Sequence, residues 1–148
     1  MAEKAKYWVS LKLILRRGDE VLGLLARNTG EYSGFYDFPG GRIHIDELAA
    51  PFHDVLNREV QEEIGEVRYR LHPAPVAIGR HVTKNGDAIL YVFFIGDYES
   101  GEPMLSHEHE GSAWLRVDPS NLEKYFTSGI LEGVRTYLSS RTAVKDPS

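Results

Sequence analysis

Apolar and polar residues alternate through most of residues 8–15, and this two-residue period is typical of a strand with one buried face. The polar turn at residues 17–20 (Arg-Gly-Asp-Glu) follows, and residues 21–26 are again mostly apolar. Two apolar segments joined by so short a turn predict an antiparallel hairpin.

A second hairpin is predicted in the middle of the chain. Residues 76–82 and 88–95 flank a polar loop that contains Asn85-Gly86, a dipeptide typical of hairpin turns. Residues 88–95 are apolar throughout, which is typical of a central strand covered on both faces. A shorter strand is predicted over residues 67–71.

Three segments are predicted to be helical. Pro51 suits the first turn of a helix and Gly65 suits a left-handed helix end, whereas Asp118-Pro119 predicts the start of a short helix. Apolar residues recur at near-helical intervals. The inward-facing positions are Phe52, Val55, Leu56, Val60 and Ile64, then Leu122, Tyr125 and Phe126, then Ile130, Leu131, Val134, Tyr137 and Leu138. Together these elements predict a mixed sheet between helices.

Composition narrows the class of protein. With 42% hydrophobic and 26% charged residues, the 148-residue chain is expected to form one globular domain over residues 1–148 and to be cytoplasmic. No apolar run approaches 18 residues and the first residues do not resemble a signal peptide, so no membrane partner is expected. The absence of cysteine excludes disulfides and a cysteine nucleophile, and the net charge of −5 argues against a nucleic-acid duplex as partner.

The segment of residues 58–65 concentrates acidic side chains on one helix face. At about 100° per residue, Glu59, Glu62 and Glu63 project within an arc of roughly 100°, where like charges repel. Such a cluster becomes favourable around a hard divalent cation, because Mg²⁺ and Mn²⁺ prefer oxygen ligands. The competing interpretation is a solvated acidic helix face.

The same segment resembles the Nudix box, G-x5-E-x7-R-E-U-x-E-E-x-G-U, in which U is aliphatic. Gly41 and Glu47 match its opening, and residues 58–65 match its core. Two positions depart from the pattern: ten residues rather than seven separate Glu47 from Arg58, and Glu66 stands at the closing aliphatic position. The three extra residues are expected to lengthen the helix at its start or to bulge the loop, which leaves open whether Glu47 still reaches Arg58.

The resemblance implies an α/β/α sandwich and a bound Mg²⁺, with Mn²⁺ as the alternative ion. It implies that Glu59, Glu62, Glu63 and the carbonyl of Gly40 are metal ligands, and that Glu62 and Glu63 take part in catalysis. Arg58 is expected to orient the carboxylates, although an ordinary salt bridge within the helix is a competing role.

A second acidic cluster, His107-Glu108-His109-Glu110, precedes Trp114. Many Nudix hydrolases have a Glu, often followed by His, six residues before a tryptophan, and Glu108 has this spacing. By resemblance Glu108 is expected to bind a metal or to deprotonate the attacking water, with His109 as an orienting partner. Strand alternation would place Glu110 on the same side as Glu108, so Glu110 remains an alternative for this role. The competing interpretations are a polar loop and a zinc site at the His107/His109 pair.

Several cations and aromatic residues are candidates for substrate contact. Each cation competes with the role of a solvated surface charge, and each aromatic residue with core packing. For phosphate these candidates are Arg27, Arg42, Arg80 and Lys84, and for a stacked base Tyr32, Phe35, Tyr36 and Tyr91.

These features predict a Mg²⁺-dependent hydrolase that cleaves the pyrophosphate bond of a nucleoside diphosphate linked to another moiety. The alternative is a catalytically silent Nudix-like domain that binds a nucleotide or a protein. A Nudix-fold isopentenyl diphosphate isomerase is disfavoured because the catalytic cysteine has no counterpart. The partner is expected to be a small nucleotide-linked molecule, and a homodimer is an open alternative to a monomer.

Overall fold

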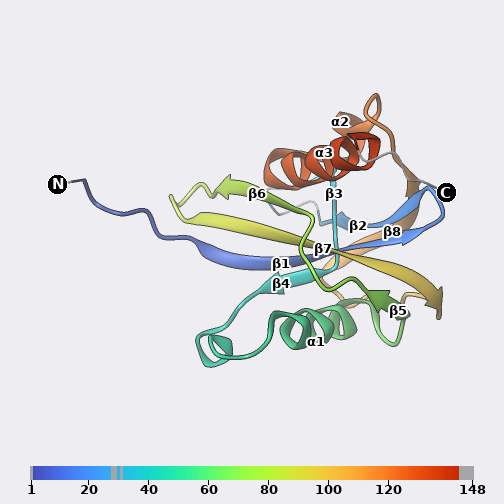
Figure 1. Ribbon diagram of the computed structural model, residues 1–148, viewed down its shortest axis with the longest axis horizontal. Coiled ribbons are helices and arrows are strands. Elements are labelled where there is room, and N and C mark those ends of the chain that lie inside the picture. Colours follow the sequence, from blue (N-terminus) through green and yellow to red (C-terminus); the bar gives the residue numbers. More distant parts are fainter. Residues whose placement is uncertain (1, 28–29, 31, 144–148) are drawn as a thin grey trace.

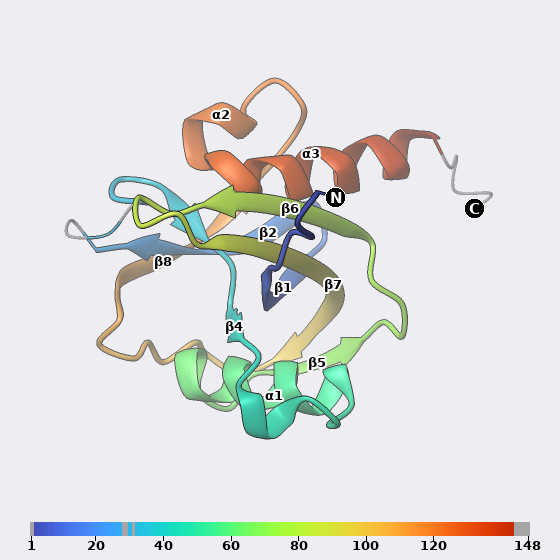
Figure 2. The ribbon, with the colours of Figure 1, turned by 90° about the vertical axis from the view of Figure 1, so that its left-hand side faces the viewer.

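A mixed β-sheet lies between helices on both of its faces in the computed structural model, which describes residues 2–27, 30 and 32–143 (Figure 1). Helix α1 (Phe52–Ile64) covers one face, and α2 (Leu122–Tyr125) and α3 (Ser128–Ala143) cover the other. Figure 2 shows the same three layers after a quarter turn. The predicted α/β/α sandwich is therefore confirmed. None of the described helices is long and apolar enough to cross a membrane.

The two longest strands, β1 (Trp8–Arg17) and β7 (Ala88–Ser100), run parallel at the centre of the sheet, in register from Trp8 opposite Ile89 to Arg16 opposite Asp97. The remaining strands pair antiparallel with their neighbours. Strand β7 pairs with β6 (Ala77–Val82) and β5 (Arg68–Leu71). Strand β1 pairs with β4 (Gly40–Arg42) and β2 (Glu20–Ala26). Strand β2 also pairs with β3 (Tyr36–Asp37) and β8 (His109–Arg116).

Strand β1 divides its outer edge between two partners. Its first half pairs with β4, where Lys12 lies opposite Gly40, and its last residues pair with β2, where Arg16 lies opposite Val21. The two strands of the N-terminal hairpin therefore pair only beside their turn. As a result, the Gly40–Gly41 segment lies directly against the centre of the sheet.

Each face of the sheet has its own hydrophobic core, and alternation along the strands separates them. The core on the α1 side contains, among others, Leu11, Leu13, Leu15 and Phe94 of the strands and Val55, Leu56, Val60 and Ile64 of α1. The core on the side of α2 and α3 contains, among others, Ile14, Phe38, Phe93 and Phe126 together with Ile130, Val134 and Tyr137 of α3. The central position of β7 and the apolar faces of α1 and α3 agree with the apolar pattern of the sequence, with one exception. Phe52, which we expected to face inward, is 47% exposed because it lies at the first residue of α1, beyond the edge of the core.

Both predicted hairpins are confirmed, with β6 and β7 joined as Asn85-Gly86 indicates. Helix α1 ends before Gly65, whose φ of 76° and ψ of −153° place it outside the left-handed helical region that we expected. The expected helix start at Asp118-Pro119 is wrong. The Asp118 carboxylate instead accepts the backbone N–H of Ser120 at 2.8 Å, which closes a turn, and α2 begins only at Leu122. The loop expected at residues 28–34 lies partly outside the described residues.

Candidate active site

The buried carboxyl group of Glu63 lies at the centre of the box. Its Oε1 accepts the backbone N–H of Gly40 at 2.7 Å, so that the end of α1 is joined to β4 at the middle of the sheet. Burial raises the pKa of this carboxyl to about 7, although the nearby Lys12 ammonium and the Gly40 N–H oppose the shift. A carboxyl with that pKa exchanges its proton near neutral pH, which is typical of a functional site.

Glu59 lies one helical turn before Glu63 and packs against Gly41. Its side chain is 12% exposed, and its Oε2 would lie only 2.4 Å from a Cβ placed on Gly41. The glycine therefore leaves the space in which this carboxylate sits. Glu59 and Glu63 thus meet the two consecutive glycines of the box from the same face of α1.

Arg58 gathers three carboxylates on the outer side of this cluster. Its Nη2 donates to Glu47 Oε2 at 2.6 Å and to Glu59 Oε1 at 2.9 Å, and its Nη1 donates to Glu62 Oε1 at 3.0 Å. The hydrogen bond to Glu47 raises the pKa of the guanidinium. Glu47 lies in the 3₁₀ turn η1 (Ile45–Glu47), so it reaches Arg58 despite the longer spacing. Glu62 is 60% exposed and lies at the rim.

The loop before β8 is attached to the C-terminal end of α1. The N–H of Ser106 donates to the carbonyl of Glu63 at 3.0 Å, and the N–H of Met104 donates to that of Ile64 at 2.8 Å. These bonds satisfy carbonyl groups that the last helical turn leaves without partners. They also bring His109, the first residue of β8, to Glu63, with Nδ1 3.6 Å from Glu63 Oε2. Burial lowers the pKa of the His109 imidazole.

Glu108 and Glu110 take different positions around His109. Glu108 lies in the turn before β8 and lines a cavity of about 440 Å³ together with Arg27, Tyr32 and His109. Glu110 lies within β8 and is exposed. The side chain of Arg27 donates through Nε to the carbonyl of His107, which ties the turn to the end of β2.

A buried ion pair that the sequence interpretation missed lies beside Glu63. Lys12 Nζ lies 3.1 Å from Asp37 Oδ2, and both residues line a cavity of about 280 Å³. Tyr32 and Tyr91 also line it, and their hydroxyl groups are 2.9 Å apart. The available signal was Ser10 and Lys12, two polar residues on one face of an otherwise apolar strand.

The predicted substrate residues lie in different environments. Arg42 lines the cavity at Lys12, and its guanidinium carbon lies 4.6 Å from the ring centroid of Trp8. Tyr36 packs edge-on against Tyr125 beside the core under α2. Arg80 lies on the outer strand β6 and pairs with Glu132 of α3 at 2.9 Å. Their assignment to substrate stays a prediction, as does that of Arg27.

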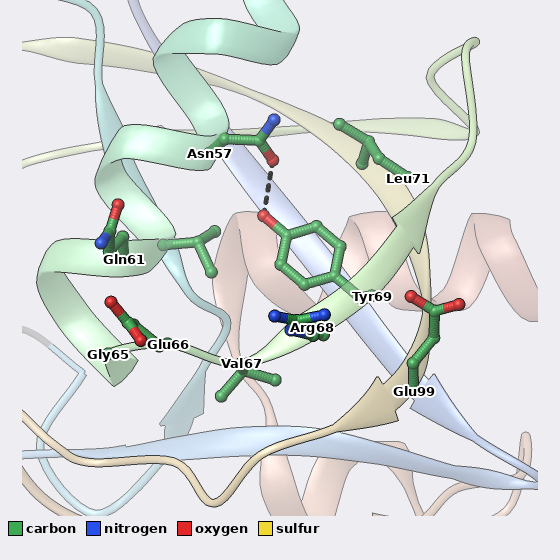
Figure 3. Close-up of a pocket in the computed structure, with 10 residues that line it drawn as sticks. Asn57, Gln61, Gly65, Glu66, Val67, Arg68, Tyr69, Leu71 and Glu99 are labelled. Carbon is green, nitrogen blue, oxygen red and sulfur yellow. Dashed lines mark hydrogen bonds between the residues drawn. The ribbon is translucent and has the colours of Figure 1, made fainter.

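A further cavity of about 630 Å³ lies between α1 and β5 (Figure 3). Asn57, Gln61 and Tyr69 line it, and the hydroxyl group of Tyr69 donates to Asn57 Oδ1 at 2.6 Å. Glu59, Glu62 and Glu63 are not among its lining residues. This cavity is therefore separate from the carboxylate cluster.

The donor groups fit a divalent cation. Glu59 and Glu63 offer carboxylate oxygens beside main-chain glycines, and the buried Nδ1 of His109 has no hydrogen-bond partner among the described atoms. Ligand atoms of His44, Glu47 and Glu59 also lie within 4.8 Å of one another. In that second group the N–H of His44 donates to Glu47, and Arg58 donates to it as well; both bonds lower the pKa of the Glu47 carboxyl. We therefore favour the group around Glu63.

Comparison with known proteins agrees with this geometry. The family model of the NUDIX domain matches residues 6–132, and no curated protein matches the chain. A MutT protein from Methanosarcina mazei Go1 has a similar structure, with a TM-score of 0.70, 21% identity, and coverage of 97% of this chain and 100% of that one. An ADP-ribose pyrophosphatase from Streptococcus suis has a TM-score of 0.61 at 17% identity, covering 97% and 96%. A UDP-X diphosphatase has a TM-score of 0.66 at 9% identity, covering 96% and 66%.

The chain therefore belongs to the Nudix family. The structural likenesses, at these identities, establish the fold. The α/β/α sandwich is thus of the Nudix type, as the resemblance of the box implied.

Proposed function

We propose that the chain is a Mg²⁺-dependent enzyme that hydrolyses the pyrophosphate bond of a nucleoside diphosphate linked to another moiety. The observation that carries the proposal is the burial of the Glu63 carboxyl one turn after the largely buried Glu59. Carboxylates withdrawn from water in this way are costly unless a cation compensates their charge. Arg58 pairs with Glu59, whereas no described Lys or Arg forms an ion pair with the Glu63 carboxyl.

Each residue of the cluster has a role in the proposal. Glu59, Glu62, Glu63 and the carbonyl of Gly40 hold the metal, and Arg58 orients Glu59 and Glu62. A divalent cation supplies an activated water and draws charge from the phosphate oxygens. Glu108 accepts the proton of that water or acts as a further ligand. Manganese is the alternative ion, and a cytoplasmic location stays an expectation.

The charges around the cavities support the proposed substrate class. Lys12, Arg27 and Arg42 line the two cavities next to the carboxylates, where they suit phosphate oxygens. Two proteins of similar structure are an ADP-ribose pyrophosphatase and a UDP-X diphosphatase. Both names describe nucleoside diphosphates joined to a second group, and this supports the same class for the present chain.

A product analysis tests the reaction. The purified chain is incubated with Mg²⁺ or Mn²⁺ and a panel of sugar nucleotides, dinucleotides and nucleoside triphosphates, and both products are identified by chromatography. We expect a nucleoside monophosphate and a phosphorylated second product from one or more linked nucleoside diphosphates. Binding without turnover of any panel member would instead indicate the catalytically silent alternative.

A matched pair of variants tests the site. We expect Glu63→Gln to lower turnover by about 10²–10⁴-fold, because the amide cannot replace the carboxylate, and to melt at the same or a higher temperature. Glu66→Gln removes the same charge from an exposed position just beyond the helix, and it should hydrolyse at the wild-type rate. Equal losses in the two variants would contradict the assignment.

A second pair of variants separates the carboxylates of the loop. A general base must reach the attacking water, and Glu108 lines the cavity beside His109. We expect Glu108→Gln to lower kcat by about 10²–10⁴-fold with little change in KM, and Glu110→Gln to cost far less. A crippled Glu110→Gln enzyme beside a normal Glu108→Gln enzyme would reverse the two roles.

A further inference from the structure

The imidazole of His109 is buried at the site, beside the carboxyl of Glu63. The side chain is only 9% exposed, and no partner for Nδ1 is found among the described atoms. Its nearest acidic oxygen, Glu63 Oε2, lies 3.6 Å away, beyond the usual 2.7–3.2 Å or so of an N–H···O bond. Buried polar atoms without partners are rare, and at such a position a bound ion is one explanation.

Local structure directs this side chain toward Glu63. His109 pairs with Ala26, whereas Gly111 pairs with Leu25, so Glu110 is an extra residue in β8. Such a bulge re-aims the neighbouring side chains and is common beside active sites. The preceding loop is held to the end of α1 by the bond from Ser106 N–H to the Glu63 carbonyl. Two separate backbone features therefore place the nitrogen beside the carboxylate.

We propose that Nδ1 of His109 and Oε2 of Glu63 are ligands of the same divalent cation, and that the site consequently prefers Mn²⁺ to Mg²⁺. This inference rests on the metal site of the proposed function. Mg²⁺ is bound almost entirely by oxygen, whereas imidazole nitrogen suits the transition metals. A ligand set that includes one imidazole should therefore shift selectivity toward Mn²⁺.

Another histidine could supply a nitrogen and must be tested against His109. His44 lies near Glu47 and Glu59, with Nδ1 3.6 Å from Glu47 Oε1, but its side chain is 62% exposed. Three of the remaining histidines have contacts elsewhere: His53 with the Pro73 carbonyl, His72 with Asp97 and His81 with Ser128. His107, two residues before His109, is exposed and gives a matched control.

The test measures metal binding in the absence of substrate. Mn²⁺ is added to the metal-free full chain, its affinity is obtained from the loss of the free-ion electron paramagnetic resonance signal, and pulsed measurements detect nitrogen bound to the ion. We expect nitrogen coupling in the wild type, in His44→Gln and in His107→Gln, and none in His109→Gln. We also expect His109→Gln to weaken Mn²⁺ binding about 10-fold or more and Mg²⁺ binding, measured by competition, much less.

Each other outcome overturns the inference in a recognisable way. Mn²⁺ bound without nitrogen coupling leaves the carboxylate site and the proposed function standing but removes His109 from the ligands. Coupling that is lost in His44→Gln assigns the nitrogen to the other group. Absence of Mn²⁺ binding with Mg²⁺ still bound overturns the inference alone, whereas absence of both ions contradicts the proposed function as well. If His109→Gln does not fold, retained coupling in both control variants still supports His109, and its loss in either overturns the proposal.

Discussion

At the scale of single residues, Gly40 and Gly41 lack side chains for different reasons. A Cβ on Gly40 would lie 1.9 Å from the carbonyl oxygen of Leu11, and the φ of Gly40 is 141°. A Cβ on Gly41 would instead meet Oε2 of Glu59, the flexible end of a side chain. The first glycine is therefore required by the contact of β4 with β1, and the second by the position of a carboxylate.

We expect Gly40→Ala to prevent folding or to lower the free energy of unfolding by more than about 3 kcal/mol. Gly41→Ala is expected to fold and to lose metal affinity and turnover, because Glu59 must move aside. Circular dichroism melts and Mg²⁺ titrations of the two variants check this difference. Wild-type turnover in Gly41→Ala would show that Glu59 is not needed where it lies.

At the scale of elements, the contact between Glu47 and Arg58 joins the turn η1 to α1. The box has three additional residues between them, yet Nε and Nη2 of Arg58 both donate to Glu47 Oε2, at 2.9 and 2.6 Å. The same guanidinium holds Glu59. The path of the turn is thus connected to the orientation of a proposed metal ligand.

Loss of this contact is expected to weaken the metal site more than the fold. In Glu47→Gln the acceptor loses its negative charge, so the bonds from the Arg58 guanidinium weaken and Arg58 is freer to turn toward Glu59 and Glu62. We expect about a 10-fold loss of Mg²⁺ affinity and a fall of only a few degrees in melting temperature. Asp46→Asn removes the same charge from the neighbouring exposed position and is the control. An equal loss there would mean that net charge, not the contact, sets the affinity.

At the scale of the whole molecule, stability is expected to depend on pH through Glu63. Its pKa rises from 4.5 to about 7 in the folded protein. Between these values the folded protein holds a proton that the unfolded chain has released. The free energy of unfolding of the metal-free protein therefore falls as the pH rises through this window, on the order of 3 kcal/mol in total.

Melting temperatures of the metal-free wild type and Glu63→Gln at pH 5 and pH 8 check this sign. The melting temperature of Glu63→Gln should rise relative to that of the wild type between pH 5 and pH 8, because its amide does not ionise. Glu66→Gln should follow the wild type at both values. Added Mg²⁺ should stabilise the wild type more at pH 8 than at pH 5, since a ligand carboxyl must be deprotonated. A constant difference between wild type and Glu63→Gln would contradict the raised pKa.

Local patterns in the sequence were sufficient to predict most of the helices and strands and to recognise the Nudix box. Strand β7, the apolar faces of α1 and α3, and the spacing of Glu59 and Glu63 depend on residues that are neighbours along the chain or one helical turn apart. A period of two or 3.6 residues is visible without any knowledge of distant segments. The one misplaced helix start, at Asp118, occurred where a turn and a short helix compete for the same side chain.

Tertiary structure alone decided which polar groups meet. Lys12 pairs with Asp37, 25 positions away, because β4 takes up part of the edge of β1. Glu47 reaches Arg58 because η1 and the loop after it absorb the additional residues, and His109 reaches Glu63 through a bulge and a docked loop. Each of these contacts depends on the register between separate strands or on the path of a loop. Strand register and loop path are not encoded in the periodicity of one segment, because the packing of all layers together determines them.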